Sequence, residues 1–145
     1  MATTTHVSRP PAGRVKIRTT DPTDQAFLIL RSAFTVAPIL FGLDKYFNFM
    51  VHWPIYLAPW LNRIVPGTAQ EFMYVAGVIE IVAGLVVAFW PEFGGYLVAA
   101  WLGGIVINLL TANPAQFYDI ALRDFGLMLA ALALARLAAG RRRAA

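Results

Sequence analysis

Seven charged side chains interrupt the long apolar stretches of this sequence, and they are the groups best placed to carry chemistry. Charges inside a bilayer cost free energy, so they usually face the interior of a helix bundle, pair with one another or reach an interface. The near balance of the two signs predicts that these groups pair with one another. Three are basic and four are acidic, namely Arg31, Lys45, Arg123, Asp44, Glu80, Asp119 and Asp124.

These polar groups support two interpretations, and the sequence leaves both open. In the first, the charges hold the helices together. In the second, they line a pocket in which Glu80 or Asp124 exchanges protons or binds the headgroup of a ligand. The candidate cluster for such a pocket consists of Glu80, Arg123, Asp124, Asp119, Lys45 and Asn108.

Other chemistries lack the residues they need. The chain contains no cysteine and only two histidines, His6 and His52, so it cannot by itself supply a disulfide, a catalytic thiolate or an iron–sulfur ligand set. The sequence has no metal-ligand spacing, nucleotide-binding loop or nucleophile–base pair. We therefore predict no catalytic residue, no metal site and no cofactor held by this chain alone, and we expect quinone or lipid as the small-molecule ligand.

Glu80 lies on a small-residue face of an expected helix. Gly77, Glu80 and Gly84 stand at i, i+3 and i+7, which places them on one side of a helix where glycines allow close approach of a neighbour. Glu80 is nine residues past Glu71. At ~1.5 Å rise per residue it lies about 13 Å deep, near the middle of a ~30 Å hydrocarbon core.

Two more helices show a similar polar or small-residue stripe. Gly104 and Asn108 share one face of the third apolar stretch. On the fourth, Asp119 and Arg123 are i, i+4 neighbours and Gly126 continues their stripe, which predicts that Arg123 points inward. We expect helix packing at the glycines of these stripes, namely Gly77, Gly84, Gly104 and Gly126.

The elements that must position these groups are membrane spans. Of the 145 residues, 59% are hydrophobic and 14% are charged, and the mean hydropathy is +0.61, which is unlike a water-soluble protein. The sequence predicts an all-α, polytopic membrane protein whose fold is a bundle of four transmembrane helices. The expected spans are residues 26–47, 71–90, 93–110 and 117–139, which together form one transmembrane domain over residues 26–139.

The connection between the first two spans is long and aromatic. It contains His52, Trp53 and Trp60 among prolines, which predicts an interfacial segment, and its length indicates either a docking loop or an added cap. His52 is either a solvated loop residue or a proton donor or hydrogen-bond partner for a quinone.

Basic residues gather at the two ends of the chain, which predicts membrane topology and not nucleic-acid binding, despite a pI near 9.9. Residues 1–25 are expected to be a disordered, basic cytoplasmic arm, and residues 140–145 a basic cytoplasmic tail. Four spans would place both ends on the same side, as this pattern requires. Eight of the twelve basic residues lie near the two ends of the chain: Arg9, Arg14, Lys16, Arg18, Arg136, Arg141, Arg142 and Arg143.

Three segments resemble those of a known family. They are FGLDK at residues 41–45, GVIEIVAG at residues 77–84 and YDIALRD at residues 118–124. The first is similar to the Gly-x-x-Lys motif, and the second to the Gly-x-x-Glu-x-x-x-Gly motif, of the DoxX family of small bacterial membrane proteins. The resemblance extends over nearly all of residues 25–138, but the connection over residues 48–70 is unusually long for this family.

This resemblance implies a four-helix fold in the bacterial cytoplasmic membrane and, for some relatives, association with oxidoreductases that use quinone or handle thiosulfate or oxidative stress. Together with the missing redox groups, it leads us to expect a non-catalytic accessory or anchoring subunit whose partners are membrane lipid and other protein subunits. The alternative is a protein that binds or transports a small molecule, quinone or protons through its polar cluster.

Overall fold

The structure is a computed structural model that describes residues 20–112 and 117–145. Within these residues every regular element is a helix, so the predicted all-α class is confirmed. The elements in chain order are α1 (Pro22–Phe47), the short 3-10 helix η1 (Trp53–Tyr56), α2 (Pro59–Ile64), α3 (Ala69–Phe89), α4 (Pro91–Ala112) and α5 (Tyr118–Ala144).

Helix α1 begins four residues before the predicted start at residue 26 because Asp21 caps it. The Asp21 carboxylate accepts a hydrogen bond of 2.8 Å from the Thr23 amide, and Pro22 supplies a first residue whose missing N–H needs no partner. The helix ends at Phe47, and Asn48 follows it in the left-handed conformation, with φ of 50°. The rest of the expected arm, residues 1–19, lies outside the described residues.

Helix α3 and helix α4 form a hairpin with a single residue, Trp90, between them. A capping box starts α3, in which the Thr68 hydroxyl accepts from the Glu71 amide at 3.2 Å and the Glu71 carboxylate accepts from the Thr68 amide at 2.6 Å. Pro91 starts α4, because proline suits the first position of a helix and interrupts the preceding one.

Helix α5 is the longest, with 27 residues. It continues to Ala144, so the predicted tail at residues 140–145 is part of the helix and not a separate segment. The expected turn over residues 111–116 falls largely on residues 113–116, which lie outside the described residues, while Thr111 and Ala112 complete α4.

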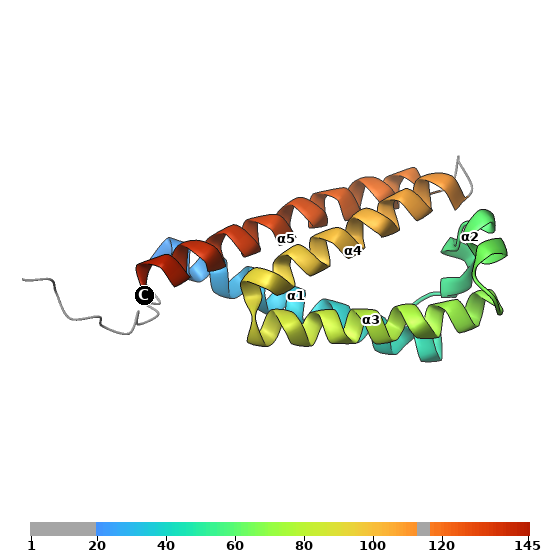
Figure 1. Ribbon diagram of the computed structural model, residues 1–145, viewed down its shortest axis with the longest axis horizontal. Coiled ribbons are helices and arrows are strands. Elements are labelled where there is room, and N and C mark those ends of the chain that lie inside the picture. Colours follow the sequence, from blue (N-terminus) through green and yellow to red (C-terminus); the bar gives the residue numbers. More distant parts are fainter. Residues whose placement is uncertain (1–19, 113–116) are drawn as a thin grey trace, which may run out of the picture.

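The four long helices form two pairs (Figure 1). Helix α1 packs along α3, and α4 packs along α5. The pairs meet at the end where α3 turns into α4, and they separate toward the other end, where η1 and α2 lie. A core drawn from all four long helices fills the region where the pairs meet, and it consists of Phe27, Phe34, Ala83, Val87, Val98, Ala99, Ala131, Leu134 and Ala138.

The closed end also brings together the two ends of the helical chain. Asp24, in the first turn of α1, forms an ion pair with Arg141, near the end of α5. The side chain of Arg141 also lies over the ring of Phe27, 4.6 Å from its centroid. The start of α1 and the end of α5 therefore lie at one end of the molecule.

Glycines set the close contact between α1 and α3. A Cβ atom on Gly77 would lie 2.6 Å from the Gly42 carbonyl oxygen, and one on Gly84 would lie 2.7 Å from the Thr35 carbonyl oxygen. The backbones touch at both levels, since real Cβ atoms do not approach so closely. These pairings also show that the two helices are antiparallel.

The glycines predicted to pack on the third and fourth spans have no close neighbour within residues 20–112 and 117–145. Among these residues, a Cβ atom on Gly104 or on Gly126 would meet no atom of a neighbouring element within 4 Å. The contact between α4 and α5 lies elsewhere, at Gly95, where an added Cβ would come 2.8 Å from the Ala131 carbonyl oxygen. The expected packing at Gly104 and Gly126 is not seen between α4 and α5, because these helices turn a different face toward each other.

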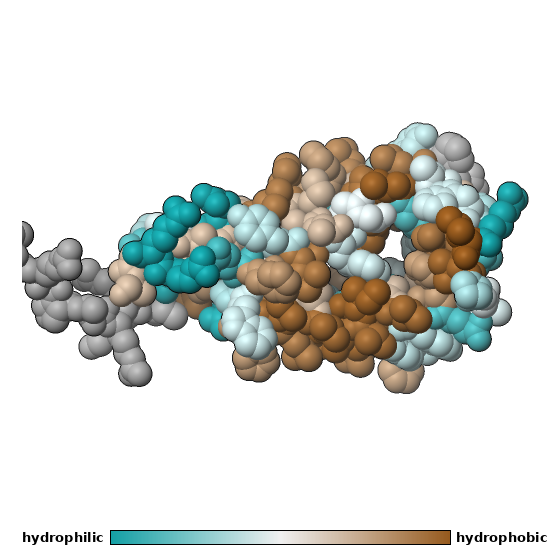
Figure 2. Space-filling view, in the orientation of Figure 1, coloured by the Kyte–Doolittle hydropathy of each residue, from teal (hydrophilic) through white to brown (hydrophobic). Residues whose placement is uncertain are grey.

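Three helices, α1, α3 and α4, are long and apolar enough to cross a membrane. The 21 residues of α3 span about 31 Å at ~1.5 Å per residue, which matches a hydrocarbon core. Figure 2 shows apolar surface over the middle of the molecule and hydrophilic residues at its two ends. Helix α5 differs, because any 18 consecutive residues of it contain three or more charged side chains. The sequence prediction of a multi-pass membrane fold is supported, but its fourth span is not.

Candidate functional site

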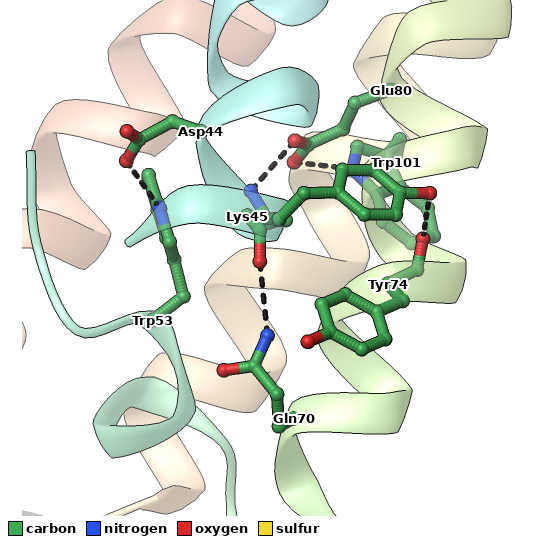
Figure 3. A network of polar contacts seen from close by, with 8 residues as sticks. Asp44, Lys45, Trp53, Gln70, Tyr74, Glu80 and Trp101 are labelled. Atoms are coloured by element: carbon green, nitrogen blue, oxygen red, sulfur yellow. Dashed lines mark hydrogen bonds and ion pairs between the residues drawn. The ribbon is translucent and has the colours of Figure 1, made fainter. Parts of the chain in front are cut away.

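A buried ion pair between α1 and α3 forms the centre of the candidate site (Figure 3). The Lys45 Nζ lies 2.6 Å from Glu80 Oε2, and the two side chains are 6% and 9% exposed. Side chains lean toward the N-terminus of their own helix. Because α1 and α3 are antiparallel, Lys45 and Glu80 lean toward each other and meet although they start from different levels.

The second oxygen of Glu80 reaches the other helix pair. Trp101, in the middle of α4, donates from Nε1 to Glu80 Oε1 at 3.3 Å. This contact is longer than the usual 2.7–3.2 Å range of an N–H···O bond, so it is the weaker of the two contacts made by the carboxylate. Glu80 thus links α1 and α4 from its position on α3.

An indole ring covers the other side of the lysine. The Lys45 Nζ lies 3.8 Å from the centroid of the Trp53 ring, within the range of a cation–π interaction. The same indole donates from Nε1 to Asp44 Oδ2 at 2.7 Å. The Asp44 carboxylate also accepts from the amides of Phe49 and Met50, each at 3.1 Å from Oδ1, where the chain leaves α1.

Two amide side chains fasten this end of α1 to the start of α3. Gln70 donates to the Lys45 carbonyl oxygen at 2.9 Å and accepts from the Asn48 side chain at 2.9 Å. Asn48 in turn accepts from the Trp53 amide at 3.1 Å. The backbone that carries Lys45 and the backbone that carries Trp53 are therefore fixed by the same pair of residues.

Asn108 holds the connecting segment instead of joining the charged cluster. Its Oδ1 accepts from the Ala58 amide at 2.8 Å, and its Nδ2 donates to the Tyr56 carbonyl oxygen at 2.7 Å. Trp60 adds a hydrogen bond of 2.8 Å to the Thr111 hydroxyl. The segment between α1 and α3 is thereby attached to α4. His52 is exposed, precedes η1 and makes no capping hydrogen bond with its side chain.

The candidate residues on α5 separate into one buried and two exposed groups. Asp124 is buried at 7% exposure, whereas the Arg123 side chain is 66% exposed and Asp119 is exposed. Arg123 contacts Asp124 at 3.1 Å between Nε and Oδ1. The prediction that Arg123 points inward was wrong, since the buried face of α5 follows Ala121, Asp124, Ala131 and Ala135. The stripe through Asp119, Arg123 and Gly126 lies on the other side.

Arg31 lies far from Lys45 and Glu80, toward the closed end. Its guanidinium donates to the carbonyl oxygen of Ala88, near the end of α3. It also lies 5.9 Å from the centroid of the Phe27 ring, so it belongs with the contacts that join the ends of the helices.

The predicted cluster lacked four residues that contribute to the site or fasten it, namely Asp44, Trp53, Gln70 and Trp101, of which Trp53 was expected only in the docking loop. Asp44 was recognised as an embedded charge but not as a member of the cluster. Trp101 carried a usable signal: it lies halfway along an apolar stretch, away from the interfaces that tryptophan favours, and a buried indole N–H needs an acceptor. Gln70 carried no such signal, because it lies at the start of a helix.

The assembled site is a closed polar network, which we call the Lys45–Glu80 cluster and define as Asp44, Lys45, Trp53, Glu80 and Trp101. Both oxygens of each carboxylate have donors from the same chain. Among the described residues no group of three histidine, aspartate or glutamate side chains is placed to hold a metal ion.

Comparison with known proteins gave no relative. The chain matches no protein-family model, no curated protein and no solved structure.

Proposed function

We propose that this chain is a DoxX-like membrane protein that serves as a non-catalytic accessory or anchoring subunit of a larger membrane complex, one associated with an oxidoreductase. One observation carries the proposal: every charged group of the Lys45–Glu80 cluster has a partner within this chain. Glu80 is held by Lys45 at 2.6 Å and by Trp101 at 3.3 Å, so its charge is used to join helices. The association with an oxidoreductase rests on the resemblance of residues 41–45, 77–84 and 118–124.

The energetics of the cluster favour this structural use. A buried charge without a partner is strongly destabilising, whereas a pair with further hydrogen bonds is tolerated and fixes the relative position of its helices. Lys45 has a carboxylate on one side and the Trp53 ring on the other.

We further propose four crossings, with both termini in the cytoplasm of a bacterial cell and the helices in its cytoplasmic membrane. Helix α5 lies antiparallel along α4, as the contacts of Gly95 with Ala131 and of Gly103 with Met128 indicate. If α4 crosses the bilayer, α5 follows it back. Arg141, Arg142 and Arg143 then lie on the cytoplasmic side, as the positive-inside rule requires.

The segment between α1 and α3 offers a surface for a protein partner. Several large apolar side chains are exposed there, outside the helices that are apolar enough to cross the membrane. Phe49 is 90% exposed and Ile64 is 66% exposed. The segment is also held in place, by Asn108 and by the Trp60–Thr111 hydrogen bond, so a partner would meet an ordered surface.

Copurification tests the accessory proposal. The tagged chain is extracted from its native membrane in mild detergent and the associated proteins are identified. We expect a redox protein at constant ratio, and we expect the variant Phe49→Ser/Ile64→Ser to lose it. Val78→Ser is the matched control, because Val78 is also exposed, at 51%, but lies on the spanning helix α3. Recovery of the chain without a partner at constant ratio would contradict the proposal.

One contact favours a second candidate, the binding of quinone or another small molecule or of protons. The 3.3 Å contact between Trp101 and Glu80 is weak enough for a ligand carbonyl or hydroxyl to take the place of one partner. In this case a short-chain soluble quinone would quench tryptophan fluorescence, and Glu80→Gln would abolish the quenching while the protein stays folded. Equal quenching in the wild type and in Glu80→Gln would dismiss this candidate.

A further inference from the structure

A surface concavity of about 590 Å³ lies beside the turn between α3 and α4, at the closed end of the molecule. Its walls are mainly aromatic and well exposed: Phe89 at 71%, Trp90 at 66% and Phe93 at 65%. Helix α3 ends here and α4 begins, so a bilayer crossed by these two helices would have its lipid headgroups at the level of this concavity. The lining residues are Phe89, Trp90, Pro91, Glu92, Phe93, Tyr96, Ala138 and Arg142.

One arginine of α5, Arg142, lines this concavity, and a second, Arg136, contacts the lining residue Tyr96. The Nη2 atom of Arg142 lies 3.1 Å from both carboxylate oxygens of Glu92, yet the side chain is 75% exposed. The Nη1 atom of Arg136 contacts the Tyr96 hydroxyl at 3.5 Å. Each of these contacts engages one nitrogen of a guanidinium that carries three, so both arginines keep donors for an acceptor from outside the chain.

We propose that this concavity binds the headgroup of an anionic phospholipid. The phosphate would bind between Arg136 and Arg142, and an acyl chain would lie against Phe89 and Phe93. Arginine suits this purpose because its planar guanidinium presents paired donors to phosphate oxygens. Tryptophan and tyrosine also favour the headgroup layer, and Trp90 and Tyr96 occupy it here.

The charges around the concavity select an anionic ligand. In the part of the chain that the structure describes, the closed end has more arginines than carboxylates, and one carboxylate, Asp24, already pairs with Arg141. The aromatic walls distinguish a lipid from a soluble anion, because a free phosphate would gain nothing from them. The arginines are Arg31, Arg136, Arg141, Arg142 and Arg143, and the carboxylates are Asp21, Asp24 and Glu92.

A substitution at Glu92 should raise the affinity for anionic lipid, whereas substitution of the arginines should lower it. Its carboxylate is the internal competitor for the guanidinium of Arg142, so the phosphate must share this arginine with it. The variant Glu92→Gln removes the competing charge and keeps the shape of the side chain. We expect this variant to bind anionic lipid more tightly than the wild type does.

The experiment uses the full-length protein in detergent, titrated separately with phosphatidylglycerol and with phosphatidylcholine. Thermal unfolding and native mass spectrometry report stabilisation and retained lipid. We expect phosphatidylglycerol to be retained and to stabilise the wild type more than phosphatidylcholine does. The variant Arg136→Gln/Arg142→Gln should bind phosphatidylglycerol roughly tenfold more weakly. Arg63→Gln is the matched control, since this exposed arginine lies on α2, at the opposite end.

Equal effects of the two lipids on the wild type would overturn the proposal, and so would an unchanged lipid preference in the glutamine double variant. The same stabilisation by soluble glycerol 3-phosphate alone would indicate a site for free phosphate and would also overturn it. An acidic peptide that competes fully with the lipid would assign the surface to a protein partner instead. If the glutamine double variant does not fold, two other variants test the lipid affinity. Arg136→Lys/Arg142→Lys keeps the positive charge but not the paired donors of arginine. Glu92→Gln should raise the affinity for phosphatidylglycerol.

Discussion

The Nζ atom of Lys45 lies 2.6 Å from Oε2 of Glu80, inside the contact between α1 and α3. Each residue is buried beside a glycine that brings the two backbones together, Gly42 on α1 and Gly77 on α3. The ion pair and the glycine contact thus support each other. The short distance between the helices keeps lipid away from the charges, and the ion pair in turn fixes the register of the two helices.

Breaking this pair should destabilise the protein strongly. Either Lys45→Met or Glu80→Gln leaves a buried charge without its partner, which typically costs about 3–5 kcal/mol. The double variant Lys45→Met/Glu80→Gln leaves no unpaired charge, so its loss should be clearly smaller than the sum of the single losses. Unfolding of the four proteins in the same detergent measures this coupling. Additive losses would mean that the two groups do not interact in the membrane protein as purified.

Trp53 should show two separable contributions. Trp53→Phe keeps a ring over Lys45 but removes the indole donor to Asp44, and we expect it to cost about 1–2 kcal/mol. Trp53→Ala also uncovers the ammonium group and should cost roughly 2 kcal/mol more. Thermal unfolding of both variants tests the order. Trp60→Phe is the control, because its indole bond to Thr111 is exposed.

The glycines of α3 and α4 should respond differently to alanine. Gly84→Ala forces a Cβ against the Thr35 carbonyl oxygen, and such overpacking typically costs about 1–3 kcal/mol. Gly104→Ala meets open space, so it should be neutral or stabilise the helix by up to about 1 kcal/mol. Melting temperatures of the two variants give the comparison. A destabilised Gly104→Ala would point to a contact with a second chain at this position.

Asn108 should control the order of the segment between α1 and α3. Asn108→Ala removes the partners of the Ala58 amide and the Tyr56 carbonyl, and each unsatisfied buried group costs about 1–3 kcal/mol. We expect faster hydrogen exchange over residues 53–64, measured by mass spectrometry. Arg63→Gln, which is exposed within the same segment, should leave the exchange unchanged. Equal exchange in all three proteins would show that other contacts hold the segment.

Topology can be tested directly because the chain has no cysteine of its own. In intact cells, a membrane-impermeant maleimide should label Asn62→Cys and should not label Ala145→Cys until the membrane is opened. This result follows if α5 returns across the bilayer beside α4. Labelling of Ala145→Cys from outside would instead indicate three crossings, and the proposed cytoplasmic C-terminus would be rejected.

The sequence determined the class of fold and the approximate position of each long helix. Long apolar stretches cannot satisfy their backbone groups in lipid except as helices, so their length and hydropathy alone predict spans near residues 71–90 and 93–110. The helix limits then differ by a few residues because capping is local. Asp21 extends α1 to Pro22, for example, and this interaction does not affect hydropathy.

The partners of the charges were decided only by the tertiary structure. Helical periodicity places Glu80 on the same face as Gly77 and Gly84, but it does not say which face of a neighbouring helix lies opposite. For α5, the stripe through Arg123 and Gly126 is not the buried face. Trp53 and Trp101 reach the ion pair from a connecting segment and from another helix pair. Such contacts depend on how each helix is rotated about its own axis relative to its neighbours. No single helix determines this rotation, because the packing and the hydrogen bonds of all helices in the bundle must be satisfied together.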